Sequence, residues 1–414
     1  MPFLRFLFLA IMLLPGLTPP AGARQVDPDL ETRIRGTFGP LAESRDFSGA
    51  IAFCYGDGPV SVIAFGYADW QTGRAFSAGT PVPAGAVTDS LTRVLAQRLV
   101  DTGRLSPADP LRRYLPGAGA EDSVAELLDP ETRSDTRLIE VIEQAARARF
   151  ETFAATEILG PLGLDNSRIT RRPAALAVLA EAYEPGPRPL DLRPAPPRHQ
   201  TGSPELVTTA PDLTRLAQAV LSRRIDLFRA NGSLMAGWRV IQREGEVIYT
   251  VTGSQPGYSA GVSILAGREL AIAYVANIDS FPTPRIDALL QELALGGRPA
   301  VAGRPATAAL EPGHFDALGQ YDSAVFGSVS LVQSGSGLDL VLPQSGRRDH
   351  LTPIGPGRLF WRRAGAELAY ERDEAGRVTA LTGRRVTPEP GMAIRLERTG
   401  LPPLAAPSAA DPAD

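Results

Sequence analysis

The chain has 414 residues, of which 43% are hydrophobic and 21% charged, so it is globular and long enough for two or three domains. Its net charge of −4, with arginines scattered throughout, forms no basic stripe and argues against nucleic acid as a partner. The single cysteine, Cys54, excludes an internal disulfide, and its strand-like surroundings predict a buried, inert thiol rather than a reactive one.

The N-terminal segment has the pattern of a secretory signal peptide. Residues 1–23 contain Arg5, an apolar run from Phe6 to Leu14 and a small-x-small cleavage site at Ala21-Gly22-Ala23. The apolar run is too short to cross a bilayer comfortably, and no later stretch approaches about 20 apolar residues. We therefore expect a periplasmic or secreted protein with no integral membrane segment once the signal is removed.

The next part of the chain predicts a mixture of helices and strands. Pro28 to Phe38 predicts a helix stopped by Gly39-Pro40, and Ser48 to Tyr67 predicts a hairpin that turns at Gly56-Asp57-Gly58. Apolar residues at helical spacing predict a helix that begins near Gly85 and ends at Gly103. Further helices are expected at 136–159, 211–222 and 284–295, a Pro-rich loop at 185–197, and strands at 237–243, 246–252, 261–266 and 270–276.

The C-terminal part changes to strand-like alternation. Residues 297–312 are rich in Gly, Ala and Pro and predict a linker. Short alternating runs between 313 and 400 predict a small antiparallel β-barrel or sandwich, and residues 401–414 predict a disordered tail. The expected domains are thus the signal peptide, a main domain over 24–296, the linker, the C-terminal β domain and the tail.

Five segments in collinear order point to a known family. They are Asp46 to Ala50 with Gly66 to Asp69; Leu99 to Pro116, ending in Tyr-Leu-Pro; the Pro-Leu-Gly-Leu turn at 161–164; Gly202 to Leu221; and Thr252 to Tyr258. Together they resemble the serine β-lactamase-like family of class C β-lactamases, DD-peptidases and related esterases. The resemblance, over residues 46–277, implies an α/β (α+β) fold with an antiparallel sheet, flanking helices and a reduced helical subdomain. The C-terminal β domain looks like an appendage that many such relatives carry.

The residues at the catalytic positions of this family differ here. Where the family carries Ser-x-x-Lys, this chain has Ala86-Val87-Thr88-Asp89, so both the nucleophilic hydroxyl and the amine that activates it are missing. All 42 basic residues are arginine, so no lysine elsewhere can replace the base. An arginine-rich genome bias also explains a general depletion of lysine, but it should spare an essential one.

Two further motifs of the family are also absent. The Lys-or-His-x-Gly motif reads Val251-Thr252-Gly253, which removes a cation that would orient a substrate carboxylate. Tyr-x-Asn should lie just before the helix at 136, but residues 129–135 contain no tyrosine and the segment is shorter than in the family. Three concerted losses predict a pseudoenzyme.

Ser90 and the three histidines are the alternatives to the missing nucleophile and base. Ser90 precedes Arg93 in a Ser-x-x-Arg pattern, but arginine stays protonated and cannot act as the base. Asp89 and Arg93 are spaced for an i,i+4 ion pair, a structural role that we favour over a chemical one. The three histidines, His199, His314 and His350, lie outside any motif and lack metal-ligand spacing, so no metal or cofactor is expected.

The backbone part of the family's site needs no particular side chain. The resemblance implies that the amides of Ala86 and Ser254 form an oxyanion hole that can hold a carbonyl without attacking it. The expected ligand site comprises Ala86, Ser90, Thr252, Gly253 and Ser254, and the expected partners are a cell-wall peptide, a small acyl molecule or a periplasmic protein. Two alternatives are an active serine hydrolase with a relocated nucleophile and a structural assembly component.

Overall fold

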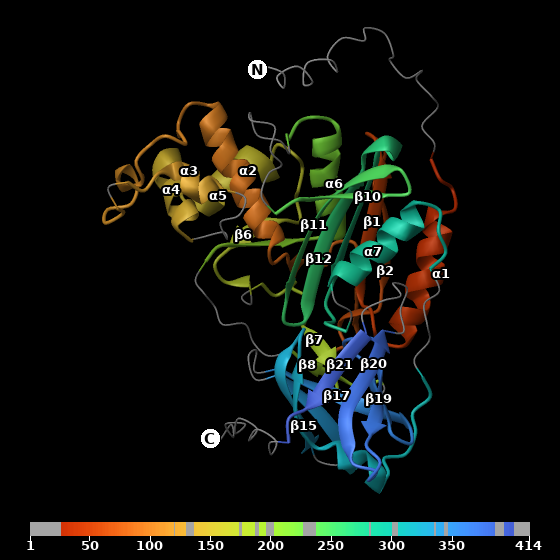
Figure 1. Cartoon of the computed structure of the whole chain (residues 1–414). Coiled ribbons are helices and arrows are strands. Elements are labelled where there is room, and N and C mark those ends of the chain that lie inside the picture. The colour runs from red at the N-terminus through yellow and green to blue at the C-terminus, as the bar shows by residue number, and fades with distance from the viewer. Residues whose placement is uncertain are drawn as a thin grey trace, which may run out of the picture.

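The computed structural model describes residues 26–119, 121–129, 136–173, 176–186, 190–195, 203–226, 237–280, 283–299, 305–334, 337–342, 347–385 and 393–400. The predicted signal peptide and C-terminal tail therefore lie outside the described residues. Figure 1 shows a sheet with helices on both sides and, below it, a separate β-barrel. Among the described residues, no helix is both long and apolar enough to cross a membrane.

The main unit is built on a six-stranded antiparallel sheet. Its order is β10 (Arg239–Arg243), β11 (Glu246–Gln255), β12 (Tyr258–Leu265), β13 (Leu270–Ala276), β1 (Gly49–Tyr55) and β2 (Ser61–Phe65). Every residue of β12, β13 and β1 is buried, because helices cover both faces of these central strands. The predicted hairpin is thereby confirmed as β1–β2, and each predicted strand between 237 and 276 is present.

One face of the sheet is covered by α1 (Leu30–Glu43) and α7 (Thr283–Ala294) (Figure 1). The expectation that Gly39-Pro40 ends the first helix was wrong, since α1 continues through Pro40 to Glu43. Pro40 is exposed, whereas Phe38 and Leu41 are buried in the cluster under this face. Burial of that apolar stripe offsets the hydrogen bond that proline removes from the helix.

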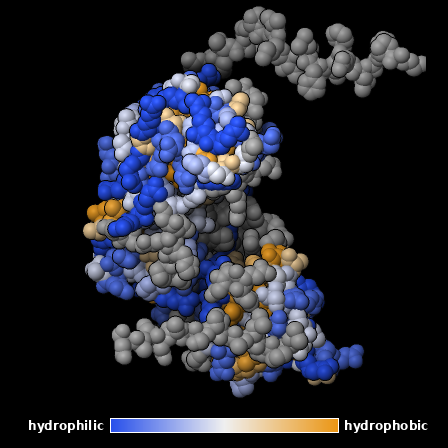
Figure 2. Space-filling view, turned by 90° about the vertical axis from the view of Figure 1, so that its left-hand side faces the viewer, coloured by the Kyte–Doolittle hydropathy of each residue, from blue (hydrophilic) through white to orange (hydrophobic). Residues whose placement is uncertain are grey.

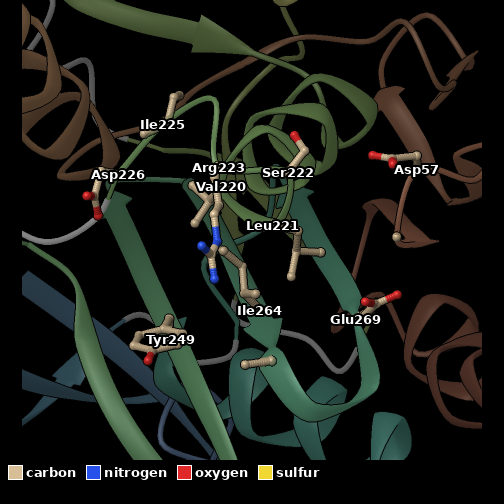
Figure 3. A pocket seen from close by; sticks show the side chains of 12 residues that line it. Asp57, Val220, Leu221, Ser222, Arg223, Ile225, Asp226, Tyr249, Ile264 and Glu269 are labelled. Atoms are coloured by element: carbon tan, nitrogen blue, oxygen red, sulfur yellow. The ribbon is translucent and has the colours of Figure 1, made fainter. Parts of the chain in front are cut away.

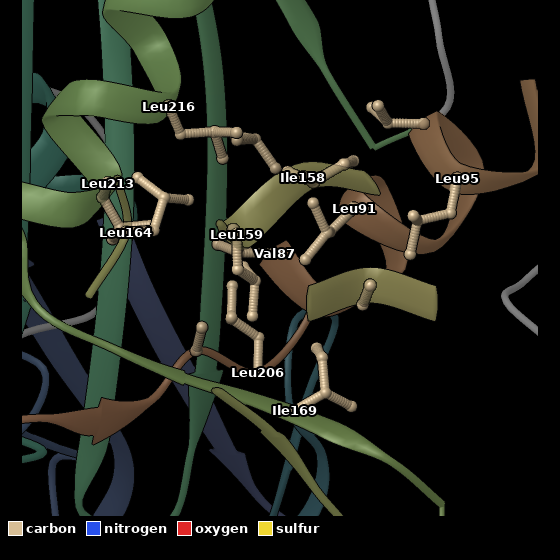
Figure 4. Packing of buried hydrophobic residues seen from close by; sticks show 14 of the residues in the cluster. Val87, Leu91, Leu95, Ile158, Leu159, Leu164, Ile169, Leu206, Leu213 and Leu216 are labelled. Carbon is tan, nitrogen blue, oxygen red and sulfur yellow. The ribbon is translucent and has the colours of Figure 1, made fainter. Parts of the chain in front are cut away.

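The opposite face carries α6 (Ala210–Leu221) and the start of α2 (Val87–Asp101), which lead into the helical subdomain. That subdomain contains η1 (Leu111–Arg113), α3 (Val124–Leu128), α4 (Thr136–Ala146), α5 (Phe150–Ala154) and the π-helical η2 (Ala155–Leu159). Figure 4 shows Val87 and Leu91 of α2 packed among apolar residues that include Ile158 and Leu159 of η2 and Leu213 and Leu216 of α6.

The single helix predicted over 136–159 was wrong. Arg147 adopts a φ of 52°, which ends α4, and the chain restarts as α5. The side chain of Glu143 accepts a hydrogen bond from Phe150 N at 2.9 Å, so an unpaired amide at the start of α5 finds a partner. The break allows Phe150 and Phe153 to be buried in the same core as Ile139.

Three small sheets connect these layers. They are β5 (Val82–Pro83), β9 (Glu205–Thr208) and β6 (Arg168–Thr170); β3 (Tyr67–Asp69) with β4 (Arg74–Ala75); and β7 (Tyr183–Pro185) with β8 (Leu192–Pro194). The region expected as a Pro-rich loop thus contains the β7–β8 hairpin. A short 3-10 turn, η4 (Ala266–Arg268), joins β12 to β13.

The C-terminal unit is a closed barrel, which decides between the two architectures that the sequence left open. After η5 (Pro312–Ala317), eight antiparallel strands close when β14 pairs with β21. Apolar residues from all sides, including Tyr321, Leu340 and Trp361, fill the interior. The strands are β14 (Gly319–Ser323), β15 (Gly327–Ser334), β16 (Gly337–Leu342), β17 (Arg347–Gly355), β18 (Arg358–Trp361), β19 (Ala366–Arg372), β20 (Val378–Arg385) and β21 (Ala393–Arg398).

The turn between β18 and β19 docks the barrel onto the main unit. The Arg362 side chain, 5% exposed, pairs with Asp46 through a 2.9 Å Nε–Oδ1 contact and donates to Asp191 O. Its neighbour Arg363 contacts Glu184 of β7 at 2.8 Å and Asp279 at 3.1 Å. Two adjacent arginines from one turn therefore join the barrel to three separate segments of the main unit.

The outer surface is mostly polar on the face seen in Figure 2, which views the molecule from the side of the helical subdomain. Its apolar areas are small and separate. Exposed large hydrophobic residues are likewise scattered along the described chain: Val26, Tyr67, Val178, Leu190, Val240 and Val325. Single exposed apolar residues are normal and define no docking patch.

Replacing Arg362 by methionine should lower the free energy of unfolding by about 3–5 kcal/mol, because Asp46 would keep a buried charge without its cation. Chemical denaturation, with the midpoint and slope fitted together, measures this. The matched control is R395Q, which breaks exposed pairs with Glu371 and Glu397 and should barely move the midpoint. Equal effects of the two substitutions would contradict a dominant role for the buried pair.

Candidate ligand-binding site

The first turn of α2 lies directly against β11. A methyl group placed on Gly253 would come within 2.1 Å of Ala84 O and 2.6 Å of Ala86 N. Gly85, with a φ of 55°, turns the chain into the helix at this point. The contact is therefore backbone against backbone, and only glycine at 253 allows it.

The contact brings together the amides that the sequence singled out. A Cβ on Gly85 would lie 3.0 Å from Ser254 N and 3.1 Å from Ser254 O. The N–H and C=O of one strand residue point to the same edge, so Ser254 presents both at the edge of β11 that faces α2. β10 pairs with β11 only as far as Thr250, which leaves this edge beyond the reach of β10.

Ala86 and Ser254 are both exposed, so this end of the contact between α2 and β11 reaches the surface. The amides of residues 87–89 donate to the carbonyls of residues 84–86, which satisfies the first turn of α2. Among the described residues, Ala86 N has no such acceptor. An exposed amide at a helix N-terminus attracts a carbonyl or carboxylate oxygen.

The other predicted site residues do not all face this point. Ser90 is only 4% exposed and lies on the buried side of α2, against Gly237 and Trp238. Thr252 pairs with Gly261 on the neighbouring strand. Its methyl group and the ring of Tyr274 both lie next to Gly261, on the side of the sheet that α7 covers. The structure therefore brings together Ala86, Gly253 and Ser254, but turns the side chains of Ser90 and Thr252 elsewhere.

Asp89 and Val251, the two positions where the family carries a basic residue, have different surroundings. Asp89 is half-buried in the first turn of α2, where an acidic side chain suits the helix dipole. Its predicted pairing with Arg93 stays a prediction; Arg93 donates to Leu127 O at 2.9 Å. Val251 is buried and borders a cavity of about 10 Å³ beside Val87 and Trp238, space for no more than one water.

A buried polar pair beside Ser254 was not predicted from the sequence. Gln255 Nε2 donates to Glu205 Oε1 at 2.8 Å, and the two residues are 8% and 6% exposed. The other polar side-chain atom of Gln255, Oε1, is a buried acceptor with no partner among the residues that the structure describes. No local pattern signals the pair, because 50 residues separate its members and only β9 brings Glu205 to this edge.

The remaining candidates have structural surroundings. His314 accepts from Glu311 N at 3.0 Å and donates to Gly355 O at 2.9 Å, while His350 contacts Asp339 at 3.0 Å within the barrel. Cys54 is buried, as predicted, and burial raises the pKa of its thiol to about 11, which disfavours the reactive thiolate. No cluster of potential metal ligands occurs in the part of the chain that the structure describes. His199 and residues 130–135, where Tyr-x-Asn was sought, lie outside it.

An antiparallel sheet between two helical layers, with the N-terminus of α2 against β11, is the fold of the penicillin-binding-protein-like serine hydrolases. Sequence comparison agrees, since the family model named Beta-lactamase matches residues 34–136 and 134–296. The chain belongs to the beta-lactamase family. A search of curated protein sequences found no match.

Several solved structures share the fold. The octameric penicillin-binding protein homologue from Pyrococcus abyssi has a TM-score of 0.55 at 16% identity, covering 89% of this chain and 100% of its own. SurE has a TM-score of 0.52 at 22% identity, covering 89% and 99%. The D-amino acid amidase from Ochrobactrum anthropi SV3, complexed with L-phenylalanine amide, has a TM-score of 0.54 at 15% identity, covering 65% and 99%. An alignment that covers 89% of this chain must extend into the barrel.

Replacing Gly253 by alanine should destabilise the protein by about 3 kcal/mol, the upper range for overpacking, because the new methyl group would push α2 away from β11. Thermal and chemical denaturation measure the loss. G36A is the control: Gly36 lies in α1 with open space around its Cα, and alanine there should stabilise by about 1 kcal/mol. A G253A protein as stable as the parent would refute the close contact.

Proposed function

We propose that this protein is an exported, catalytically inactive member of the beta-lactamase family that binds an acyl ligand at the surface where the first turn of α2 meets β11. The observation that carries the proposal is that Ala86, an exposed residue whose amide has no acceptor among the described residues, adjoins β11 where the resemblance puts the nucleophile. Candidate ligands share a carbonyl group next to an amide: a cell-wall peptide, a small acyl molecule or a segment of a periplasmic protein.

The hydrogen-bonding groups at this place suit such a ligand. Amides of Ala86 and Ser254 can donate to its carbonyl oxygen, and Ser254 O can accept from its N–H. These groups hold an acyl compound without forming a bond to it.

The side chains at the family's reactive positions supply no chemistry. Alanine at 86 has no nucleophile, so the carboxylate of Asp89 has no hydroxyl at that position to activate, and the chain contains no lysine. Ser90, the nearest alternative hydroxyl on α2, is buried and is followed by arginine rather than by a base. Loss of nucleophile and base together costs several orders of magnitude in rate, which favours binding over turnover.

Export and location form part of the proposal. Residues 1–23 have the charged start, apolar run and small-residue cleavage site of a signal peptide. A periplasmic or secreted location would place the binding site among cell-wall peptides. Fractionation of cells expressing the full chain, with N-terminal sequencing of the mature protein, tests this.

Replacing Ala86 by proline removes the amide hydrogen while retaining a φ close to the observed −65°. The affinity for N-acetyl-D-Ala-D-Ala, measured by calorimetry, should fall about tenfold. The matched control A86S keeps the amide and should bind like the parent. If A86P does not fold, A86F covers the same place and should also weaken binding; unchanged binding in a folded variant would refute the site.

The proposal also predicts that fluorescent penicillin and a fluorophosphonate leave the folded protein unlabelled. Intact-mass spectrometry after incubation measures covalent attachment, with an active serine β-lactamase as the positive control. An adduct on any serine would establish the alternative, an active hydrolase with a relocated nucleophile.

A further inference from the structure

A second cavity lies at the other end of the sheet, on the face that α6 covers. Its volume is about 590 Å³, within the range of small-molecule sites. The site at Ser254 lies at the β11–β12 turn, whereas Tyr249 and Ile264 line this cavity near the opposite strand ends. Neither the family resemblance nor the proposed function uses it.

The cavity has an apolar floor and charged walls. Val220, Leu221, Ile225 and Ile264 supply the floor. Arg223, just past the end of α6, extends its side chain over it in Figure 3. Asp226 lies on one side of Arg223 in this view.

Asp57 and Glu269 lie on the other side (Figure 3). They come from two adjacent turns of the sheet, which a 2.7 Å hydrogen bond from Gly56 N to Glu269 O holds together. The acidic wall formed by Asp57 and Glu269 therefore faces a mixed wall of Arg223 and Asp226 across apolar side chains.

Arg223 is a cation available to a ligand. Among the described residues, its guanidinium has neither a hydrogen bond nor an ion pair, although three carboxylates line the same cavity. A guanidinium recognises a carboxylate by two parallel hydrogen bonds. The acidic wall, in turn, disfavours a purely anionic ligand and favours one that also carries a cation.

We propose that this cavity binds a short peptide with free termini and apolar side chains. Its carboxylate pairs with Arg223, its ammonium group faces Asp57 and Glu269, and its side chains cover Ile264 and Leu221. The cavity is larger than a single amino acid requires, which favours a di- or tripeptide. This inference is independent of the proposed function.

Calorimetric titration of the mature protein with Leu-Leu tests the proposal. Leu-Leu should bind, while Leu-Leu-amide and N-acetyl-Leu-Leu, each lacking one terminal charge, should bind at least about tenfold more weakly. Octanoate has a carboxylate and an apolar chain but no ammonium group. Binding of octanoate as tight as that of Leu-Leu would therefore overturn the assignment. Absence of Leu-Leu binding would overturn it as well.

Substitutions locate the binding. R223Q should weaken Leu-Leu at least about tenfold, and R223K should recover part of the loss. The matched control is R224Q, because Arg224 adjoins Arg223 in sequence but does not line the cavity; it should bind like the parent. A86P, which deletes the donor of the other site, should leave Leu-Leu binding unchanged, so the two sites succeed or fail separately. Equal losses in R223Q and R224Q would refute the site.

Discussion

The close approach of α2 to β11 is the constraint on which the candidate site depends. Side chains cannot separate the two backbones, because Gly253 leaves no room for a Cβ between the strand and Ala84 or Ala86. The same contact aligns the Ala86 amide with the outward edge of Ser254. A site made of backbone groups survives changes of side chain, so the arrangement persists although alanine and aspartate occupy the first turn of the helix.

The β7–β8 hairpin packs next to this contact, and the barrel packs on the hairpin. Gly257, in the turn after Gln255, packs so closely on Ala182 and Ala195 that a Cβ there would come within 2.5 Å of Ala182 Cβ. The hairpin in turn pairs with the barrel through Glu184 and Arg363. The two arginines of one barrel turn therefore support the loop that flanks the candidate site, which gives the C-terminal unit a structural connection to it.

Local patterns predicted much of this architecture. Period-2 runs with a Gly-Asp-Gly turn identified β1–β2, and apolar residues at helical spacing identified α2 and α6, because each element buries one continuous stripe. Failures occurred where tertiary burial outweighed a local signal, at Pro40 within α1 and at Arg147 between α4 and α5. The alternation after residue 313 fits barrel and sandwich equally, since closure depends on β14 meeting β21.

The sequence by itself determined the family, through collinear motifs, and the residue types at the reactive positions. It named Ala86, Gly253 and Ser254, whose roles follow from backbone position. Only the tertiary structure decided that Ser90 and Thr252 face away, since a residue's direction depends on which element covers each face. It alone paired Gln255 with Glu205 and placed Arg223 opposite Asp57 and Glu269, because contacts between distant segments arise from packing and leave no periodic signal in the chain.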